Sequence, residues 1–243
     1  MGGSSGHLAP APQVQRLVGG SSCTAGTASA PPDPRTVLAA IDAEAMAMAQ
    51  QLATAYGADA AAAAGGGPAA ASASLQAYQT HFGLPPASGG GALNRITGQV
   101  RPSQQIALRE ELQIVSRRFA LVARLFSQSL RYSCGAGRID LGGGCADDCA
   151  TNNGDAFTCR ESTGIALCPG FWTGYPSNTA RAAILIHEAF HMIWGPNSPR
   201  GQGEIGDETL RGAGRNFDVA GCWEALVDDI FAVDSGASCP AIP

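Results

Sequence analysis

Residues 184–194 read Ile-Leu-Ile-His187-Glu188-Ala-Phe-His191-Met-Ile-Trp, and this stretch decides the fold that we expect. It holds the pattern His-Glu-x-x-His inside an apolar segment with helical character. Histidines four positions apart lie on one face of a helix, one turn apart, so both imidazoles can bind one metal ion. A Gly-Pro pair at 195–196 ends this helix and lets the chain turn back.

His187 and His191 are the predicted ligands of a catalytic zinc ion, Zn²⁺. Only four histidines occur in the chain, and two of them stand in this motif. Zinc lowers the pKa of a bound water towards about 7, and Glu188 beside the two ligands is placed to act as the general base. The alternative is a pair of ordinary core or surface histidines with an incidental glutamate. The uncharged flanks of the motif favour the metal.

The third zinc ligand must come from further along the chain, because a catalytic zinc usually has three protein ligands and one open position. Asp207 lies in a Gly-flanked loop at 203–212 and is the predicted ligand. Glu224 is the alternative third ligand; it begins a helical E-x-x-x-D pattern in which Asp228 could orient a ligating histidine. Asp218 lies between these two candidates. The plain alternatives are a solvated loop carboxylate and charges near a helix N-terminus.

Composition excludes several other classes of protein. The chain has 243 residues, which fits one domain of ordinary size with tails, and 45% of them are hydrophobic, enough for a core. The net charge of −5 without a basic run disfavours nucleic acid as a partner. No apolar run approaches the roughly 18 residues that a membrane span needs. We expect a protein or peptide substrate and a monomeric chain.

Eight cysteines indicate disulfides rather than a structural metal. Five of them lie close together within 134–168. A zinc ribbon needs two paired C-x2-C knuckles, whereas here the closest pair is Cys145-x3-Cys149 and no second knuckle follows. An even number of cysteines at such density is typical of proteins from an oxidising compartment.

The cysteines also give expectations about pairing and location. Cys168 should pair with a cysteine within 134–159, and Cys222 with Cys239. We predict a secreted or exported protein on the strength of these disulfides. Residues 1–6, Met-Gly-Gly-Ser-Ser-Gly, have neither the charged nor the apolar region of a signal peptide, so none is expected in this chain.

The predicted organisation is one domain behind a loose arm. Residues 1–34 are rich in Gly, Ser, Ala and Pro and are predicted to be a disordered N-terminal arm. The catalytic domain is predicted over 35–243, with an Ala/Gly-rich loop over 57–73. Apolar residues recur at helical spacing in five segments: 36–56, 74–82, 103–131, 178–194 and 217–232.

The cysteine-rich segment 132–170 interrupts this helical pattern. It contains many glycines and two pieces with strand character, at 138–141 and 164–167. Short strands stapled by disulfides are the natural interpretation of this segment. The fold class that we predict is therefore α+β, mostly α, with a small disulfide-stapled sheet.

Several motifs, taken in order, resemble a known peptidase family, the aspzincins, which include deuterolysin and the lysine-specific metallo-endopeptidases. The resemblance spans roughly 36–232 but is specific only over 132–191. It implies a zincin-like metallopeptidase fold that is mainly helical, a zinc endopeptidase activity and an aspartate as third zinc ligand. The motifs that carry it are Tyr132-Ser-Cys134, Asp155-Ala-Phe157, Ile165-Ala-Leu-Cys168-Pro-Gly-Phe171-Trp172, Arg181 and Ile186-His187-Glu188.

The chain departs from this family around the third ligand. The family motif is G-T-x-D-x-x-Y-G, and the nearest match here is 203–212 with Asp207 as the aspartate. Leu210 stands where the family has the tyrosine that stabilises the oxyanion. Arg211 next to it could supply a positive charge instead, and Tyr175 is another candidate donor.

The sequence thus predicts a zinc-dependent metallo-endopeptidase of zincin-like fold, with Glu188 as general base. Two alternatives stay open. One is an exported, toxin-like zinc hydrolase with a narrow or non-peptide substrate. The other is a disulfide-rich binding module whose metal site is structural or lost. An open site in a cleft would favour an enzyme, and a closed site with four protein ligands would favour the binding module.

Overall fold

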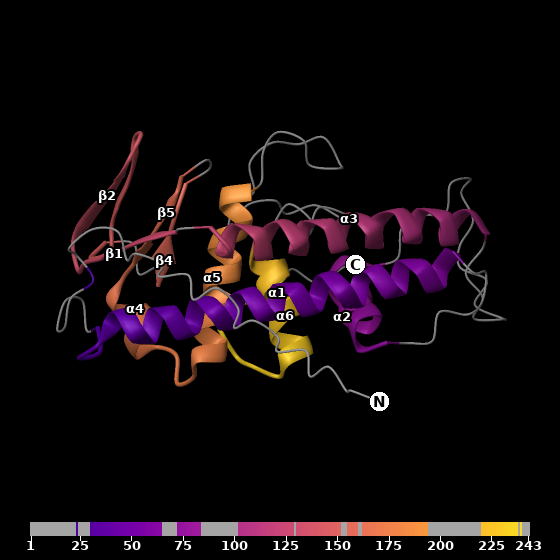
Figure 1. Ribbon diagram of the computed structural model, residues 1–243, viewed down its shortest axis with the longest axis horizontal. Coiled ribbons are helices and arrows are strands. Elements are labelled where there is room, and N and C mark those ends of the chain that lie inside the picture. The colour runs from indigo at the N-terminus through magenta and orange to yellow at the C-terminus, as the bar shows by residue number, and fades with distance from the viewer. Residues whose placement is uncertain are drawn as a thin grey trace, which may run out of the picture.

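Two long helices form the frame of the structure. The structure is a computed structural model, and it describes residues 23, 30–64, 72–83, 102–128, 130–151, 155–159, 162–193, 220–237 and 239. Helix α1 spans Pro34–Ala64 and α3 spans Pro102–Phe126. They lie side by side and run in opposite directions, so that α3 leads into the small sheet at one end of the molecule (Figure 1).

Helix α1 is longer than its hydrophobic spacing predicts. Its buried face recurs every three or four residues and continues through Ala60 and Ala63. The predicted loop over 57–73 is therefore wrong for 57–64, because alanine has the highest helix propensity and these two alanines are also buried, and it is wrong at Ala73, where α2 begins. Residues 65–71 lie outside the described part of the chain.

Three further helices pack against this frame. Helix α2 spans Ala73–Phe82 and begins at Ser72, whose hydroxyl accepts a hydrogen bond from the backbone N–H of Leu75. Helix α5 spans Asn178–Ile193 and crosses α1 and α3 steeply (Figure 1). Helix α6 spans Ala220–Phe231 and lies between α5 and α2.

An aromatic cluster joins these helices into one core. Trp223 of α6 stacks on Phe190 of α5, with ring centroids 4.8 Å apart, and meets Phe119 of α3 edge-on at 5.7 Å. Phe82 of α2 lies 4.7 Å from the same indole, and Tyr56 of α1 stacks on Phe119 at 6.0 Å. Each ring is nearly or fully buried, so the cluster fixes how α5 and α6 meet.

The sheet follows α3. Strand β1 (Arg131–Cys134) pairs in parallel with β5 (Gly164–Leu167), and β4 (Ala156–Phe157) pairs antiparallel with the other edge of β5. The predicted helix over 103–131 is wrong at its end: α3 stops at Phe126 because residues 131–134 pair with β5. A five-residue helix, α4 (Pro169–Thr173), leads from β5 towards α5.

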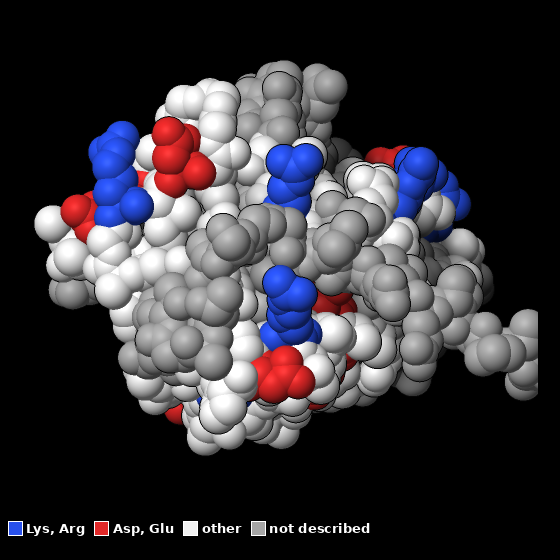
Figure 2. All heavy atoms as spheres, turned by 60° about the vertical axis from the view of Figure 1, so that its left-hand side comes forward, with Lys and Arg blue, Asp and Glu red and all other residues white. Residues whose placement is uncertain are grey.

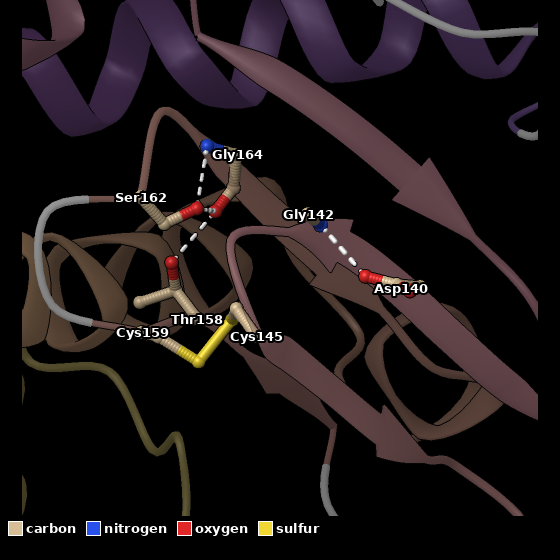
Figure 3. Close-up of a disulfide and its surroundings, with 7 residues drawn as sticks. All are labelled: Asp140, Gly142, Cys145, Thr158, Cys159, Ser162 and Gly164. Atoms are coloured by element: carbon tan, nitrogen blue, oxygen red, sulfur yellow. Dashed lines mark hydrogen bonds between the residues drawn. A yellow bond between two sulfur atoms is a disulfide. The ribbon is translucent and has the colours of Figure 1, made fainter.

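A hairpin completes the cysteine-rich part. Strand β2 (Arg138–Gly142) pairs antiparallel with β3 (Cys145–Asp148). All three glycines at 142–144 have positive φ, a conformation that side chains with a Cβ disfavour, so the turn requires them. The N–H of Gly142 donates to Asp140 Oδ1 at 2.8 Å and tightens the turn (Figure 3).

Four disulfides link all eight cysteines. The predicted pairing of Cys168 with a cysteine in 134–159 is confirmed by the Cys149–Cys168 bond, and the predicted Cys222–Cys239 bond is also present. The remaining bonds are Cys23–Cys134 and Cys145–Cys159. These four bonds indicate an oxidising, extracellular type of environment.

Two of these bonds fasten peripheral segments of the chain to the sheet or to its neighbouring segments. Cys145–Cys159 joins the hairpin to the segment before β5, where Thr158 and Ser162 both donate to the carbonyl of Gly164 (Figure 3). Cys23 is buried and bonded to β1, so this point of the predicted arm is fixed to the sheet. Most of the predicted arm lies outside the described residues.

The overall composition of the structure agrees with the predicted class, α+β and mostly α, with a small sheet stapled by disulfides. No helix among the described residues is both long and apolar enough to cross a membrane. On the face drawn in Figure 2, the described arginines stand singly or in small groups, and most of them have an acidic side chain close by.

Candidate metal centre on helix α5

Helix α5 presents the two motif histidines on one partly open face. Between Ala182 and Met192 every side chain is buried except those of His187 and His191. The apolar side chains of this segment pack into the core on the remaining faces, which leaves the imidazoles as the groups that reach solvent. The helical spacing therefore places both histidines as the sequence predicts.

The two imidazoles converge through the same ring nitrogen. His187 Nε2 and His191 Nε2 lie 3.1 Å apart. Two nitrogens that bind one tetrahedral zinc at 2.0–2.1 Å are separated by about 3.3 Å. The separation is thus close to the donor spacing of a shared zinc ion, and it also suits a hydrogen bond between the two rings.

Glu188 follows the first histidine and is buried, with an exposed fraction of 5%. A carboxylate beside a metal and largely shielded from bulk water keeps a basic oxygen near the reacting water. The structure thus places Glu188 on α5 directly after His187, and its role as general base stays a prediction.

Helix α6 brings a second carboxylate to the opposite nitrogen of His187. Glu224 Oε2 lies 2.6 Å from His187 Nδ1, across a separation of 37 residues in the chain. Such a contact fixes the orientation and tautomer of a ligating imidazole. The sequence predicted Asp228 as the orienting group and Glu224 as an alternative ligand. The E-x-x-x-D pattern predicted the helix correctly, but it did not predict which of the two carboxylates contacts the imidazole.

Asp228 binds the chain that leaves α6 instead. Asp228 Oδ2 accepts two hydrogen bonds from Ser235, one from the backbone N–H at 3.0 Å and one from the side-chain hydroxyl at 2.6 Å. Burial raises the pKa of Asp228 to about 6, and the charge of Glu224 adds to this rise, although the two hydrogen bonds from Ser235 oppose it. Asp228 is thus a structural group on the same helix as Glu224.

Tyr175, a predicted oxyanion donor, has its hydroxyl bonded to the carboxylate of Asp155. Burial and this hydrogen bond raise the pKa of Tyr175 far above its usual range, and the charges of Glu224 and Asp228 add to the rise. The phenol is therefore neutral, and it must leave Asp155 before it can donate to a substrate.

Arg181 is a structural residue of this region whose role sequence reasoning did not identify. From the first half of α5 its guanidinium donates to three backbone carbonyls, those of Phe171, Trp172 and Tyr175, at 3.2, 3.0 and 2.7 Å. It thereby ties α4 and the following loop to the metal-site helix. A single arginine in the otherwise uncharged first half of this helix was the available signal.

The other predicted site residues, Asp207 and Arg211, lie outside the described residues, as does the candidate Asp218. Within the described ranges, no group of three or more possible metal ligands comes together. The structure therefore places two of the predicted zinc ligands, the predicted base and the alternative ligand Glu224.

Comparisons with known proteins add no relative to this picture. No protein-family model, no curated protein and no solved structure matches the chain.

Proposed function

We propose that the protein is a zinc-dependent metallo-endopeptidase of the aspzincin type. The observation that carries this proposal is the convergence of His187 Nε2 and His191 Nε2 at 3.1 Å on the partly open face of α5, with the buried Glu188 between them in sequence. The mostly helical fold with a small sheet and four disulfides supports an exported enzyme of this kind.

Each predicted site residue has one role in the proposed hydrolysis. His187 and His191 hold a zinc ion, which when bound supplies a Lewis acid and makes water more acidic. Glu188 takes a proton from the attacking water and later delivers it to the nitrogen of the leaving amine. Arg211 and Tyr175 are the proposed donors for the negative charge that develops on the carbonyl oxygen of the substrate.

Asp207 is the proposed third ligand. Glu224 lies against Nδ1 of His187, on the side of the ring away from Nε2, and this position suits an orienting group better than a ligand. The Gly-Pro pair after α5 permits a return of the chain, and the glycines near Asp207 suit a tight approach to the ion. Asp207→Ala should then weaken zinc binding far more than Asp228→Asn does.

The direct test of the proposal is Glu188→Gln, assayed on casein and on mixed peptides. The variant should keep its zinc, because Glu188 is not a ligand, and should lose hydrolysis by a factor of about 10²–10⁴. Wild-type protein that binds zinc but cleaves no peptide bond, or a variant that cleaves as fast as wild type, would contradict the proposed peptidase. The first result would favour a hydrolase with a narrow or non-peptide substrate.

A further inference from the structure

We infer that Glu224 is the positioning residue of the zinc site: it accepts a hydrogen bond from the Nδ1–H of His187 and so holds the ring in the tautomer that offers Nε2 to the ion. This inference rests on the proposed function, because it assigns a role toward the zinc. It differs from the third-ligand role, in which a carboxylate oxygen of Glu224 would bind the metal itself.

The two ring nitrogens of His187 have different neighbours. Nδ1 faces Glu224 Oε2 at 2.6 Å, and Nε2 faces His191 Nε2 at 3.1 Å. A neutral imidazole has one N–H donor and one acceptor nitrogen. A carboxylate next to Nδ1 favours the tautomer with the proton on Nδ1. The lone pair is then on Nε2, the nitrogen that faces His191.

The backbone around Glu224 is held firmly against α5. The preceding residue, Trp223, is fully buried and stacks at 28° on Phe190, which lies between the two histidines in sequence. One residue earlier, Cys222 is bonded to Cys239. A shift of α6 along α5 would disrupt the stacking of Trp223 on Phe190, so this contact holds the carboxylate near the imidazole, while the disulfide ties α6 to the segment that follows it.

The burial of Glu224 calls for positive charge at the imidazole that it contacts. Its exposed fraction is 5%, and within the described residues its Oε1 has no hydrogen-bond partner. A buried carboxylate with one unsatisfied oxygen is costly unless a nearby positive charge compensates it. An imidazole that binds zinc through Nε2 carries part of the charge of the ion and donates more strongly from Nδ1.

A zinc-affinity series tests this inference. Zinc dissociation constants are measured by competition with a chromophoric chelator for the full chain, Glu224→Gln, Glu224→Ala and Asp228→Asn. Glu224→Ala should weaken zinc binding by about 10–100-fold. Glu224→Gln should weaken it less, because the amide oxygen can still accept from Nδ1. Asp228→Asn removes the same charge one helical turn away without touching His187, so it should bind zinc as wild type does.

The protonation state of His187 gives a second readout. In zinc-loaded protein, ¹⁵N NMR of the histidine ring should show a proton on Nδ1 and metal on Nε2, and Glu224→Ala should broaden or shift these signals. Circular dichroism establishes that each variant is folded, and Glu224→Gln, the nearest in shape, serves if the alanine variant is not.

Each outcome decides between clear alternatives. Wild-type zinc affinity in both Glu224 variants, with only their stability lowered, would overturn the inference in favour of a plain buried pair and leave the proposed function standing. A lost ligand in the cobalt-substituted spectrum of Glu224→Gln would overturn it in favour of direct ligation. Failure of the wild-type chain to bind zinc would overturn the proposed function itself.

Discussion

At the scale of single residues, the carboxyl group of Asp155 is held in a space that only glycine leaves free. A Cβ built on Gly170 would overlap Asp155 Oδ1, while the other oxygen of this carboxyl accepts a hydrogen bond from the Tyr175 hydroxyl. A side chain at position 170 would therefore require the carboxyl group of Asp155 to move. This contact fixes Tyr175, which lies in the loop that Arg181 ties to α5.

Gly170→Ala should therefore destabilise the protein, although alanine normally favours a helix. We expect a loss of about 1–3 kcal/mol in the free energy of unfolding, measured by urea denaturation, because the new methyl group must displace Asp155. Gly137→Ala is the matched control, since a Cβ there meets nothing within 4 Å and should change stability little. Equal effects of the two substitutions would contradict the steric explanation.

Asp228 gives a pH dependence whose sign follows from its raised pKa. Between pH 4 and 6 the folded protein still holds a proton on this carboxyl, whose pKa is about 6, while the unfolded chain, with a pKa of about 4, has released it. Stability from this group is thus fully present below pH 4 and is lost as the pH rises to 6.

The free energy of unfolding of wild type relative to Asp228→Asn should accordingly fall across this window. We expect a change of about 1 kcal/mol after allowance for partial exposure of the carboxyl, and no further change above about pH 7. Urea denaturation of both proteins at several pH values measures the difference. A difference that stays flat or rises from pH 4 to 6 would show that burial does not raise this pKa.

At the scale of elements, the sequence predicted those helices and strands that depend on residues close together in the chain. The strand at 164–167 and the helix that carries His187 follow from patterns within a few residues, and the structure has both. Strand β1 was missed because its formation depends on pairing with β5, 33 residues away at Arg131 and Gly164. Apolar residues that continue the helical pattern of α3 into this segment hid the boundary.

The candidate site divides in the same way. The face shared by His187 and His191 is a property of one helix and was predictable. The contact between His187 and Glu224 depends on how α6 packs on α5, which Trp223 and Phe190 decide through tertiary contact. The sequence therefore predicted a helix with acidic residues after the motif, but it could not predict that Glu224 of this helix would contact Nδ1 of His187.

The disulfides of two different elements should have separable effects. Cys222→Ala with Cys239→Ala, and Cys145→Ala with Cys159→Ala, each open a loop of similar length, 17 and 14 residues in separation. Each pair should cost about 3 kcal/mol of stability by loop-closure entropy. Only the first pair should also weaken zinc binding, because α6 carries Glu224. Equal zinc affinities in the two variants would argue against coupling through α6.

At the scale of the whole molecule, helix α5 lies where the two long helices, α6 and the three-stranded sheet meet. Helix α5 contacts α1 and α3 of the long frame, α6 beside it, and β4 of the sheet (Figure 1). A helix held on so many sides cannot change its rotation easily, so its two histidines keep their spacing before any ligand arrives. This preorganisation suits a metal site, because little order has to be created on binding.

The most direct test of this account is the zinc content of the purified full chain, measured by inductively coupled plasma mass spectrometry after exhaustive dialysis. We predict about one zinc per chain in the wild type and none in His187→Ala/His191→Ala, which removes both imidazoles of the site. Zinc retained in full by the double variant, or a wild-type chain that takes up no zinc when it is supplied, would contradict the account.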